Sequence, residues 1–168
     1  YLKKKEKVDC KLATILTDYH THPQWLVLSQ YTNYFFVSND TMKIDMIKEG
    51  IPENKIFVTG IPVSERFLQE FDSEEIHKHF GLTPEKPTLL FFAGGEFGLG
   101  RNTTFMVLKA LIRMFKELQV VAISGRNKKM NKKFNDLVQS TNSSDRVKIL
   151  EFTDKVPELM SISSGVIT

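Results

Sequence analysis

The chain has 168 residues, which suffices either for one complete core or for parts of two lobes of a longer protein. Its 41% hydrophobic and 26% charged residues are typical of a folded globular protein and exclude disorder as its general state. The 23 basic and 20 acidic side chains give a net charge of +3, which is too small to indicate a nucleic-acid-binding protein.

Cysteine usage and hydropathy restrict the compartment. The single Cys10 excludes an internal disulfide framework and favours a reducing environment. No apolar run approaches the roughly 18 residues that cross a bilayer, and Tyr1 precedes a lysine run rather than a signal peptide. The sequence therefore predicts a cytoplasmic protein whose contact with a membrane is at most peripheral.

Seven short apolar runs predict the strands of parallel sheets. They are rich in Val, Ile, Leu and Phe and lack polar alternation, as strands covered on both faces do. The runs are Leu12–Thr17, Tyr34–Ser38, Ile56–Thr59, Leu89–Ala93, Val120–Ser124, Val147–Leu150 and Gly165–Thr168. Helical patterns separate them, and the clearest of these covers Thr103–Leu118. Alternating strands and helices predict an α/β fold with right-handed crossovers.

The stretch from Ser64 to Pro87 interrupts this alternation. It contains a helix start at Phe71–Glu75 and a helix stop at Gly81–Pro84. Three predicted strands precede it and four follow, and each set is smaller than a usual doubly wound sheet. The sequence therefore predicts parts of two lobes joined by a helical connection.

A glycine-rich turn follows the strand predicted at Leu89–Ala93. Gly94, Gly95, Gly98 and Gly100 lie within seven residues, directly before the long helix. Glycine lets the backbone approach a ligand closely, and a helix N-terminus offers N–H groups to an anion. The spacing matches neither the P-loop nor the dinucleotide-binding fingerprint. We therefore expect a nucleotide or phosphate cradle, with a tight turn that binds nothing as the alternative.

The next predicted strand ends in Ser124–Gly125–Arg126–Asn127. Because ligands of open α/β sheets bind at the carboxyl ends of the strands, Arg126 and Asn127 are candidate ligand contacts. No acidic residue is present there to hold the ribose of a dinucleotide. The sequence therefore argues against dinucleotide binding.

A third group of candidates follows the first predicted strand. In an extended chain Asp18, His20 and His22 share one side. The D-x-H-x-H pattern resembles the first metal-ligand pair of metal-dependent amidohydrolases, but the remaining histidines, His77 and His79, lie on the predicted connecting helix. The alternatives are a carboxylate and imidazole that act in acid–base catalysis, or hydrogen-bonded residues without a catalytic role.

Five motifs, taken in order, resemble one enzyme family. They are T-D-Y-H-T-H-P-Q-W from Thr17, V-T-G-I-P-V from Val58, F-F-A-G-G-E-F-G-L-G from Phe91, S-G-R-N from Ser124 and the closing G-V-I-T. Their order and spacing are similar to those of the monogalactosyldiacylglycerol synthases and the processive diacylglycerol glucosyltransferases, relatives of the peptidoglycan N-acetylglucosaminyltransferase. The resemblance covers nearly the whole chain.

This resemblance implies a GT-B fold with two Rossmann-like lobes. Residues 1–63 would be the C-terminal part of the acceptor-side N-lobe, residues 64–87 the interlobe linker, and residues 88–168 the N-terminal part of the UDP-sugar-binding C-lobe. Relatives continue beyond Thr168 into the rest of the phosphate and ribose site. We therefore expect this chain to be inactive alone.

The resemblance also implies site residues. Those carried over for donor binding are Gly94, Gly95, Gly98, Gly100, Asn102, Arg126, Asn127, Phe152 and Thr153. Relatives often have an arginine directly after the G-I-P-V segment, where this chain has Ser64, with Arg66 two residues later as the candidate substitute. The general base would be His22 or Asp18, although the plant-type pattern places its His-Pro one residue farther from the Asp.

The implied reaction is inverting transfer of a hexose, glucose or galactose, from a UDP-sugar to diacylglycerol or a glycolipid, without a metal or other cofactor. A lipid acceptor implies a peripheral position on the inner face of the cell membrane, and an anionic surface would attract Lys3, Lys4, Lys5 and Lys7. An ordinary solvated face is the alternative for these lysines. N-acetylglucosaminyl transfer to a lipid-linked peptidoglycan precursor and a non-catalytic nucleotide-binding module are the alternative functions.

Overall fold

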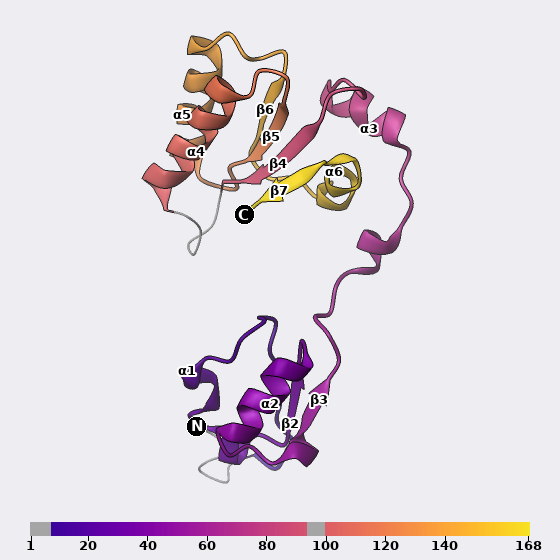
Figure 1. The fold of residues 1–168 in the computed structure, drawn as a ribbon, viewed down its shortest axis with the longest axis vertical. Helices are drawn as coiled ribbons and strands as arrows, with labels where there is room; N and C mark the ends of the chain where they lie inside the picture. The colour runs from indigo at the N-terminus through magenta and orange to yellow at the C-terminus, as the bar shows by residue number, and fades with distance from the viewer. Residues whose placement is uncertain (1–7, 94–99) are drawn as a thin grey trace. The chain divides into compact units, whose positions relative to one another are not determined.

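The computed structural model describes residues 8–93 and 100–168 (Figure 1). Gly94, Gly95 and Gly98 of the predicted cradle, and the lysines at positions 3, 4, 5 and 7, fall outside the described residues. The chain divides into two compact units, Tyr1–Glu65 and Arg66–Thr168. No helix within the described ranges is long and apolar enough to cross a bilayer.

The first unit is built on a three-stranded parallel sheet in the order β1-β2-β3. Its elements are β1 (Ala13–Ile15), α1 (Pro23–Leu26), η1 (Ser29–Tyr31), β2 (Tyr34–Val37), α2 (Asp40–Lys48), η2 (Glu53–Lys55) and β3 (Ile56–Val58). Helix α2 begins where the side chain of Asn39 accepts the N–H of Met42.

The core of the first unit lies between α2 and one face of this sheet. Phe35 and Val37 of β2 pack there with Met42 and Met46 of α2, and all four are fully buried. On the opposite face the Phe57 ring contacts those of Tyr34 and Phe36. Phe57 is exposed, so this second face is only partly covered by the described residues.

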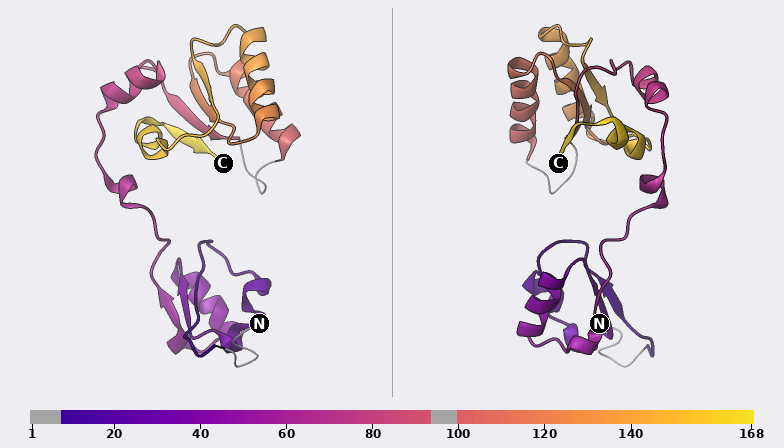
Figure 2. Two further views of the ribbon diagram at one scale, coloured as in Figure 1. Left: turned by 180° about the vertical axis from the view of Figure 1, so that it is seen from behind. Right: turned by 45° about the vertical axis from the view of Figure 1, so that its right-hand side comes forward.

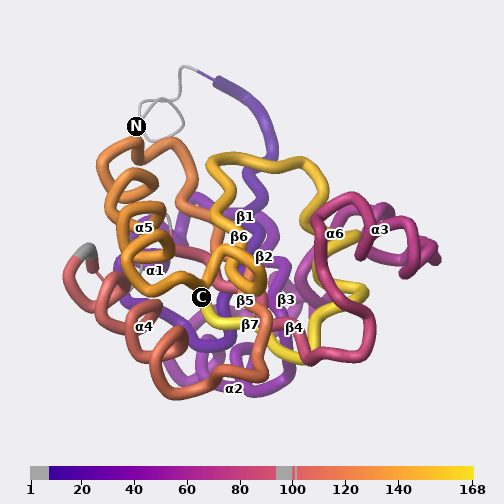
Figure 3. The backbone as a smooth tube through the Cα atoms, turned by 90° about the horizontal axis from the view of Figure 1, so that it is seen from above, coloured from indigo at the N-terminus to yellow at the C-terminus, as the bar shows by residue number. Residues whose placement is uncertain are grey.

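The second unit contains a four-stranded parallel sheet in the order β6-β5-β4-β7. A 3-10 turn, η3 (Glu65–Leu68), begins at the last residue of the first unit. The elements of the second unit that follow it are α3 (Ser73–Phe80), β4 (Thr88–Phe92), α4 (Arg101–Met114), β5 (Gln119–Ile123), α5 (Lys128–Ser140), β6 (Val147–Leu150), α6 (Val156–Ile162) and β7 (Gly165–Ile167). Helices α4 and α5 lie side by side on one face of the sheet, and α6 lies on the other with α3 beside it (Figures 2 and 3).

Alternate residues of the central strands β4 and β5 pack into two different hydrophobic cores, one on each face of the sheet. Phe91 and Ala122 point toward α4 and α5, whereas Leu90 and Val121 point toward α6. All four are fully buried, as expected for strands of a sheet with both faces covered. This arrangement leaves the carboxyl ends of the strands along one edge of the sheet.

The segment after α3 is attached to the second unit. The side chain of the buried Gln119 accepts the N–H of Thr83 at 2.7 Å and donates to its carbonyl at 2.8 Å. The range 64–87, predicted as a linker, therefore includes a helix and a loop that pack within the second unit.

The sequence located the elements well. Each of the seven predicted strands occurs, and the α/β class is confirmed. Helix α4, in contrast, ends at Met114 rather than at the predicted Leu118. Phe115, which follows the helix, has a non-helical backbone with φ −122° and ψ 80°. The guanidinium of Arg146 donates to the carbonyls of Ile112 at 2.6 Å and of Phe115 at 3.2 Å, which have no partner from a further helical turn.

Candidate functional site

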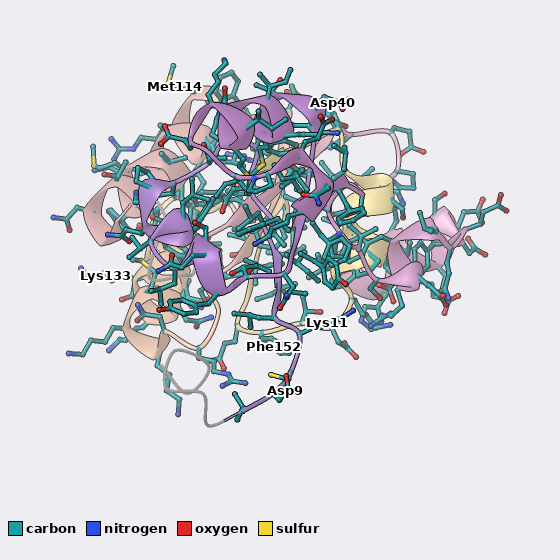
Figure 4. The ribbon with its side chains drawn as sticks, turned by 90° about the horizontal axis from the view of Figure 1, so that it is seen from below. Asp9, Lys11, Asp40, Met114, Lys133 and Phe152 are labelled. Carbon is teal, nitrogen blue, oxygen red and sulfur yellow. The ribbon has the colours of Figure 1, made fainter. Side chains whose placement is uncertain are left out.

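Two predicted donor-binding side chains meet at the carboxyl edge of the second sheet. Arg126 follows β5 and Phe152 follows β6, and these strands are neighbours. The guanidinium carbon of Arg126 lies 5.9 Å from the centroid of the Phe152 ring, within the range of a cation–π interaction. Phe152, labelled in Figure 4, is 71% exposed, and Arg126 is exposed as well. The pair therefore presents both a positive charge and an aromatic face to a ligand.

The start of α4 provides the second part of this edge. Gly100 is its N-cap residue, with φ 79° and ψ 151°, a conformation that is essentially restricted to glycine. Within the described part of the chain, no side chain caps the helix through a hydrogen bond, and its first turn carries no acidic residue. The first N–H groups of α4, next to the exposed Asn102, therefore suit an anion.

Asn127 and Thr153 have local roles in the loops that carry Arg126 and Phe152. The Asn127 carboxamide oxygen accepts the N–H of Met130 at 3.1 Å and caps α5. The Thr153 hydroxyl accepts the N–H of Lys155 at 3.1 Å at the approach to α6. Both side chains thus fix the path of a loop at the sheet edge.

The remaining donor-site candidates, Ser64 and Arg66, lie on either side of the division between the units. Ser64 belongs to the first unit. Arg66 belongs to the second, where its guanidinium lies 3.2 Å from a carboxylate oxygen of Glu158 in α6. The sequence did not predict this ion pair, because the two residues are far apart along the chain.

The histidine motif adopts a different path from the one predicted. Strand β1 ends at Ile15, and the chain bends at Asp18–His20. The segment is therefore not the extended chain in which Asp18, His20 and His22 would share one side. Hydrogen bonds to the end of β2 hold this bend. The Ser38 hydroxyl donates to the Asp18 carbonyl at 2.6 Å.

His22 caps helix α1. Its Nδ1 accepts the N–H of Gln24 at 3.2 Å, and its ring lies 5.8 Å from that of Trp25. A neutral imidazole that accepts at Nδ1 carries its proton on Nε2. Residues 8–93 and 100–168 contain no group of three or more His, Cys, Asp or Glu that could hold a metal ion.

Comparison with known sequences relates this chain to glycolipid-forming enzymes. Residues 1–63 match the family model of monogalactosyldiacylglycerol (MGDG) synthase. The chain is 33% identical over 161 residues to a processive diacylglycerol beta-glucosyltransferase of Staphylococcus epidermidis and 34% identical over 158 residues to that of Staphylococcus carnosus. The family resemblance predicted from the motifs is confirmed. The matches cover 96% and 94% of this chain but only 39% and 38% of the length of these two relatives.

Solved structures agree on the fold. A UDP-GlcNAc 2-epimerase from Neisseria meningitidis bound to UDP-GlcNAc superimposes with a TM-score of 0.71 at 18% identity, over 96% of this chain and 48% of that one. A glycosyltransferase from Rickettsia africae gives a TM-score of 0.60 at 14% identity, over 98% of this chain and 46% of that one. The predicted GT-B type of fold is thus confirmed. The chain corresponds to about half of such a fold.

Proposed function

We propose that this chain is part of an inverting glycosyltransferase that moves a hexose from a UDP-sugar to diacylglycerol. The observation that carries this proposal is the Arg126–Phe152 pair at the sheet edge. It occurs in a chain that is 30–34% identical, over at least 94% of its length, to proteins named processive diacylglycerol beta-glucosyltransferase. We assign residues 1–63 to the acceptor-side lobe, 64–87 to the linker and 88–168 to the donor-side lobe.

The donor diphosphate is assigned to the start of α4. Gly94, Gly95, Gly98 and Gly100 would bring backbone N–H groups close to it, and Asn102 lies in the first turn. These groups and the positive end of the helix dipole oppose the negative charge that builds on the departing UDP. Preorganised donors of this kind supply the stabilisation that a metal ion provides in other transferases.

Arg126 and Phe152 would divide the rest of the nucleotide between them. The guanidinium supports the diphosphate as a permanent positive charge. The exposed Phe152 ring offers an aromatic surface to the base, and stacking of this kind contributes about 1–3 kcal/mol per base in proteins that bind single-stranded nucleic acids. Because the side chains of Asn127 and Thr153 take part in local hydrogen bonds, their contribution to the donor would come mainly from the backbone and the remaining amide N–H groups.

In the proposed reaction, the acceptor hydroxyl oxygen forms a bond to the anomeric carbon while the bond from that carbon to the UDP oxygen breaks. The hydroxyl proton passes to a general base, for which we propose His22 or Asp18 of the first unit. If His22 is the base at Nε2, its ring must adopt the tautomer with the proton on Nδ1, and this gives up the bond from Gln24. The carboxylate of Asp18 requires no such change.

Transfer assays on the full polypeptide encoded by the gene test this function. Labelled UDP-glucose and UDP-galactose are offered with diacylglycerol, and a lipid-linked peptidoglycan precursor serves as the control acceptor. We expect labelled glycolipid from at least one sugar donor. Transfer to the precursor alone would support the N-acetylglucosaminyltransferase alternative, and UDP binding without any transfer would support the non-catalytic module.

The lipid acceptor leads us to propose a peripheral position on the inner face of the cell membrane. Lys3, Lys4, Lys5 and Lys7 are the candidate contacts to anionic headgroups, at about 1 kcal/mol for each charge near the surface. Co-sedimentation with anionic vesicles should weaken when these four lysines are replaced by glutamate. Unchanged sedimentation would contradict this role.

A further inference from the structure

The hydroxyl of Ser124 joins three elements next to the Arg126–Phe152 pair. Ser124 is fully buried at the end of β5, and its Oγ donates to the carbonyl of Leu150, the last residue of β6, at 3.0 Å. The same Oγ accepts a hydrogen bond from the Asn131 side chain of α5 at 3.2 Å. The hydroxyl therefore connects the ends of two strands with the helix that follows the first of them.

Asn131 is itself held in place within α5. The side-chain amide of Asn135 donates to the Asn131 side-chain oxygen at 2.9 Å and to its carbonyl at 3.0 Å. This leaves the Asn131 amide nitrogen pointing at Ser124. Asn135 is exposed, whereas the bond between Asn131 and Ser124 is partly buried. Hydrogen-bonded networks of this kind favour one arrangement of the groups that they join.

The sheet itself does not require this hydroxyl. The backbone N–H of Ser124 already donates to the Leu150 carbonyl at 2.8 Å, so the ladder between β5 and β6 is complete without the side chain. The hydroxyl adds a second donor to the same carbonyl. This donor links the starts of the two loops that leave the sheet there. Arg126 lies two residues after Ser124, and Phe152 lies two residues after Leu150.

We propose that Ser124 and Asn131 are positioning residues for the nucleotide donor. They fix the two loops relative to each other so that Arg126 and Phe152 are held in contact before UDP binds. A site that is already ordered loses less conformational freedom on binding, and its affinity is correspondingly higher. This inference rests on the proposed function, since it assumes that the edge with Arg126 and Phe152 binds a uridine diphosphate.

A purely structural role for the hydroxyl makes a different prediction. Any buried serine that loses its hydrogen bonds destabilises the protein, whatever its distance from the site. Ser143 provides a matched control in the same unit. It is 2% exposed, its Oγ donates to the Val138 carbonyl at 3.3 Å and contacts the Thr141 hydroxyl at 2.8 Å, and it lies before β6, at the amino end of the sheet.

The test is calorimetric titration of UDP into the full polypeptide, carried out on the wild type and on the Ser124→Ala and Ser143→Ala variants, with their thermal unfolding measured in parallel. We expect both variants to unfold at a lower temperature. Only Ser124→Ala should raise the Kd for UDP, by about tenfold, the size expected when the hydrogen bonds of one hydroxyl are lost. With Arg126→Ala already present, adding Ser124→Ala should change the Kd much less, because the arginine that it positions is gone.

Each result of these titrations either supports or contradicts the positioning role of Ser124. Equal affinities of the two serine variants for UDP, with a wild type that binds it, would overturn the positioning role and leave the proposed function intact. An undiminished effect of Ser124→Ala in the Arg126→Ala background would likewise show that the hydroxyl does not act through Arg126. A wild type that does not bind UDP would contradict the proposed function and this inference with it.

Discussion

The guanidinium of Arg66 lies 3.2 and 3.4 Å from the two carboxylate oxygens of Glu158. The carboxylate side chain is 15% exposed, whereas the arginine is 46% exposed, so the pair attaches η3 to the more buried helix α6. Arg66 is also the candidate substitute for the arginine that relatives place beside the donor phosphates. The two roles compete for one guanidinium.

The ion pair predicts that Arg66→Ala and Glu158→Gln have similar effects. Each should lower the free energy of unfolding of the second unit by less than about 1 kcal/mol, because the pair is partly exposed to solvent. UDP affinity should change by less than about twofold, which corresponds to under 0.5 kcal/mol. Thermal unfolding and UDP titration measure both quantities. If Arg66→Ala alone weakens UDP binding by about tenfold or more, the guanidinium contacts the donor as the family pattern implies.

The Arg126–Phe152 pair predicts a graded response to substitutions of the ring. Phe152→Leu keeps an apolar side chain but removes the aromatic face, so we expect the Kd for UDP to rise about tenfold, in line with the 1–3 kcal/mol of base stacking. Phe152→Tyr keeps the face and should stay within about twofold of the wild type. Titration of UDP into the three proteins measures this. A Phe152→Leu variant that binds as tightly as Phe152→Tyr would exclude a stacking role.

The sequence predicted those parts of the site that depend on residues close together along the chain. It did not predict contacts between segments that are far apart along the chain. Strand ends are local features, so the apolar run at Val120–Ser124 predicted the position of Arg126 just after a strand. Phe152, in contrast, was named only through the family resemblance. Their mutual contact depends on β5 and β6 being neighbours in the sheet, and this order is set by packing of the whole unit. No periodicity within either segment carries that information.

In the first unit too, a contact between distant segments determines a conformation that the local sequence does not predict. The motif around His22 was found from the sequence, but the bend at Asp18–His20 depends on Ser38, which follows a different strand. The capping role of His22 carried a local signal, because proline at the first position of a helix favours the preceding residue as the N-cap. An extended path through this segment is inconsistent with that signal.

The conformation of Gly100 predicts a defect that combines stability and binding. A Cβ at this position meets no atom of residues 8–93 and 100–168 within 4 Å, so no clash with them opposes Gly100→Ala. The substitution is unfavourable through backbone strain, at a cost of about 1–3 kcal/mol. Relief of this strain would move the start of α4, and the Kd for UDP should rise about tenfold.

Gly50 offers the matched control for Gly100. It also has a positive φ, 87°, and a Cβ there would meet no atom of the described residues within 4 Å, but Gly50 follows α2 in the first unit. Gly50→Ala should therefore destabilise the protein in thermal unfolding while UDP affinity stays unchanged. Comparable losses of UDP affinity in the two variants would show that backbone strain anywhere in the chain affects binding, and the assignment of the diphosphate to α4 would lose its support.

His22 has two possible contributions, and substitution by asparagine separates them. Asparagine is a favourable N-cap residue, so His22→Asn retains the bond to the Gln24 N–H but removes the imidazole, whereas His22→Ala removes both. If the imidazole is the general base, both variants should lower kcat by about 10²–10⁴-fold and leave the Kd for UDP nearly unchanged. Transfer assays on the full polypeptide measure kcat. Full activity of His22→Asn beside a weakened His22→Ala would instead restrict His22 to capping α1, and Asp18 would become the base to test through Asp18→Asn.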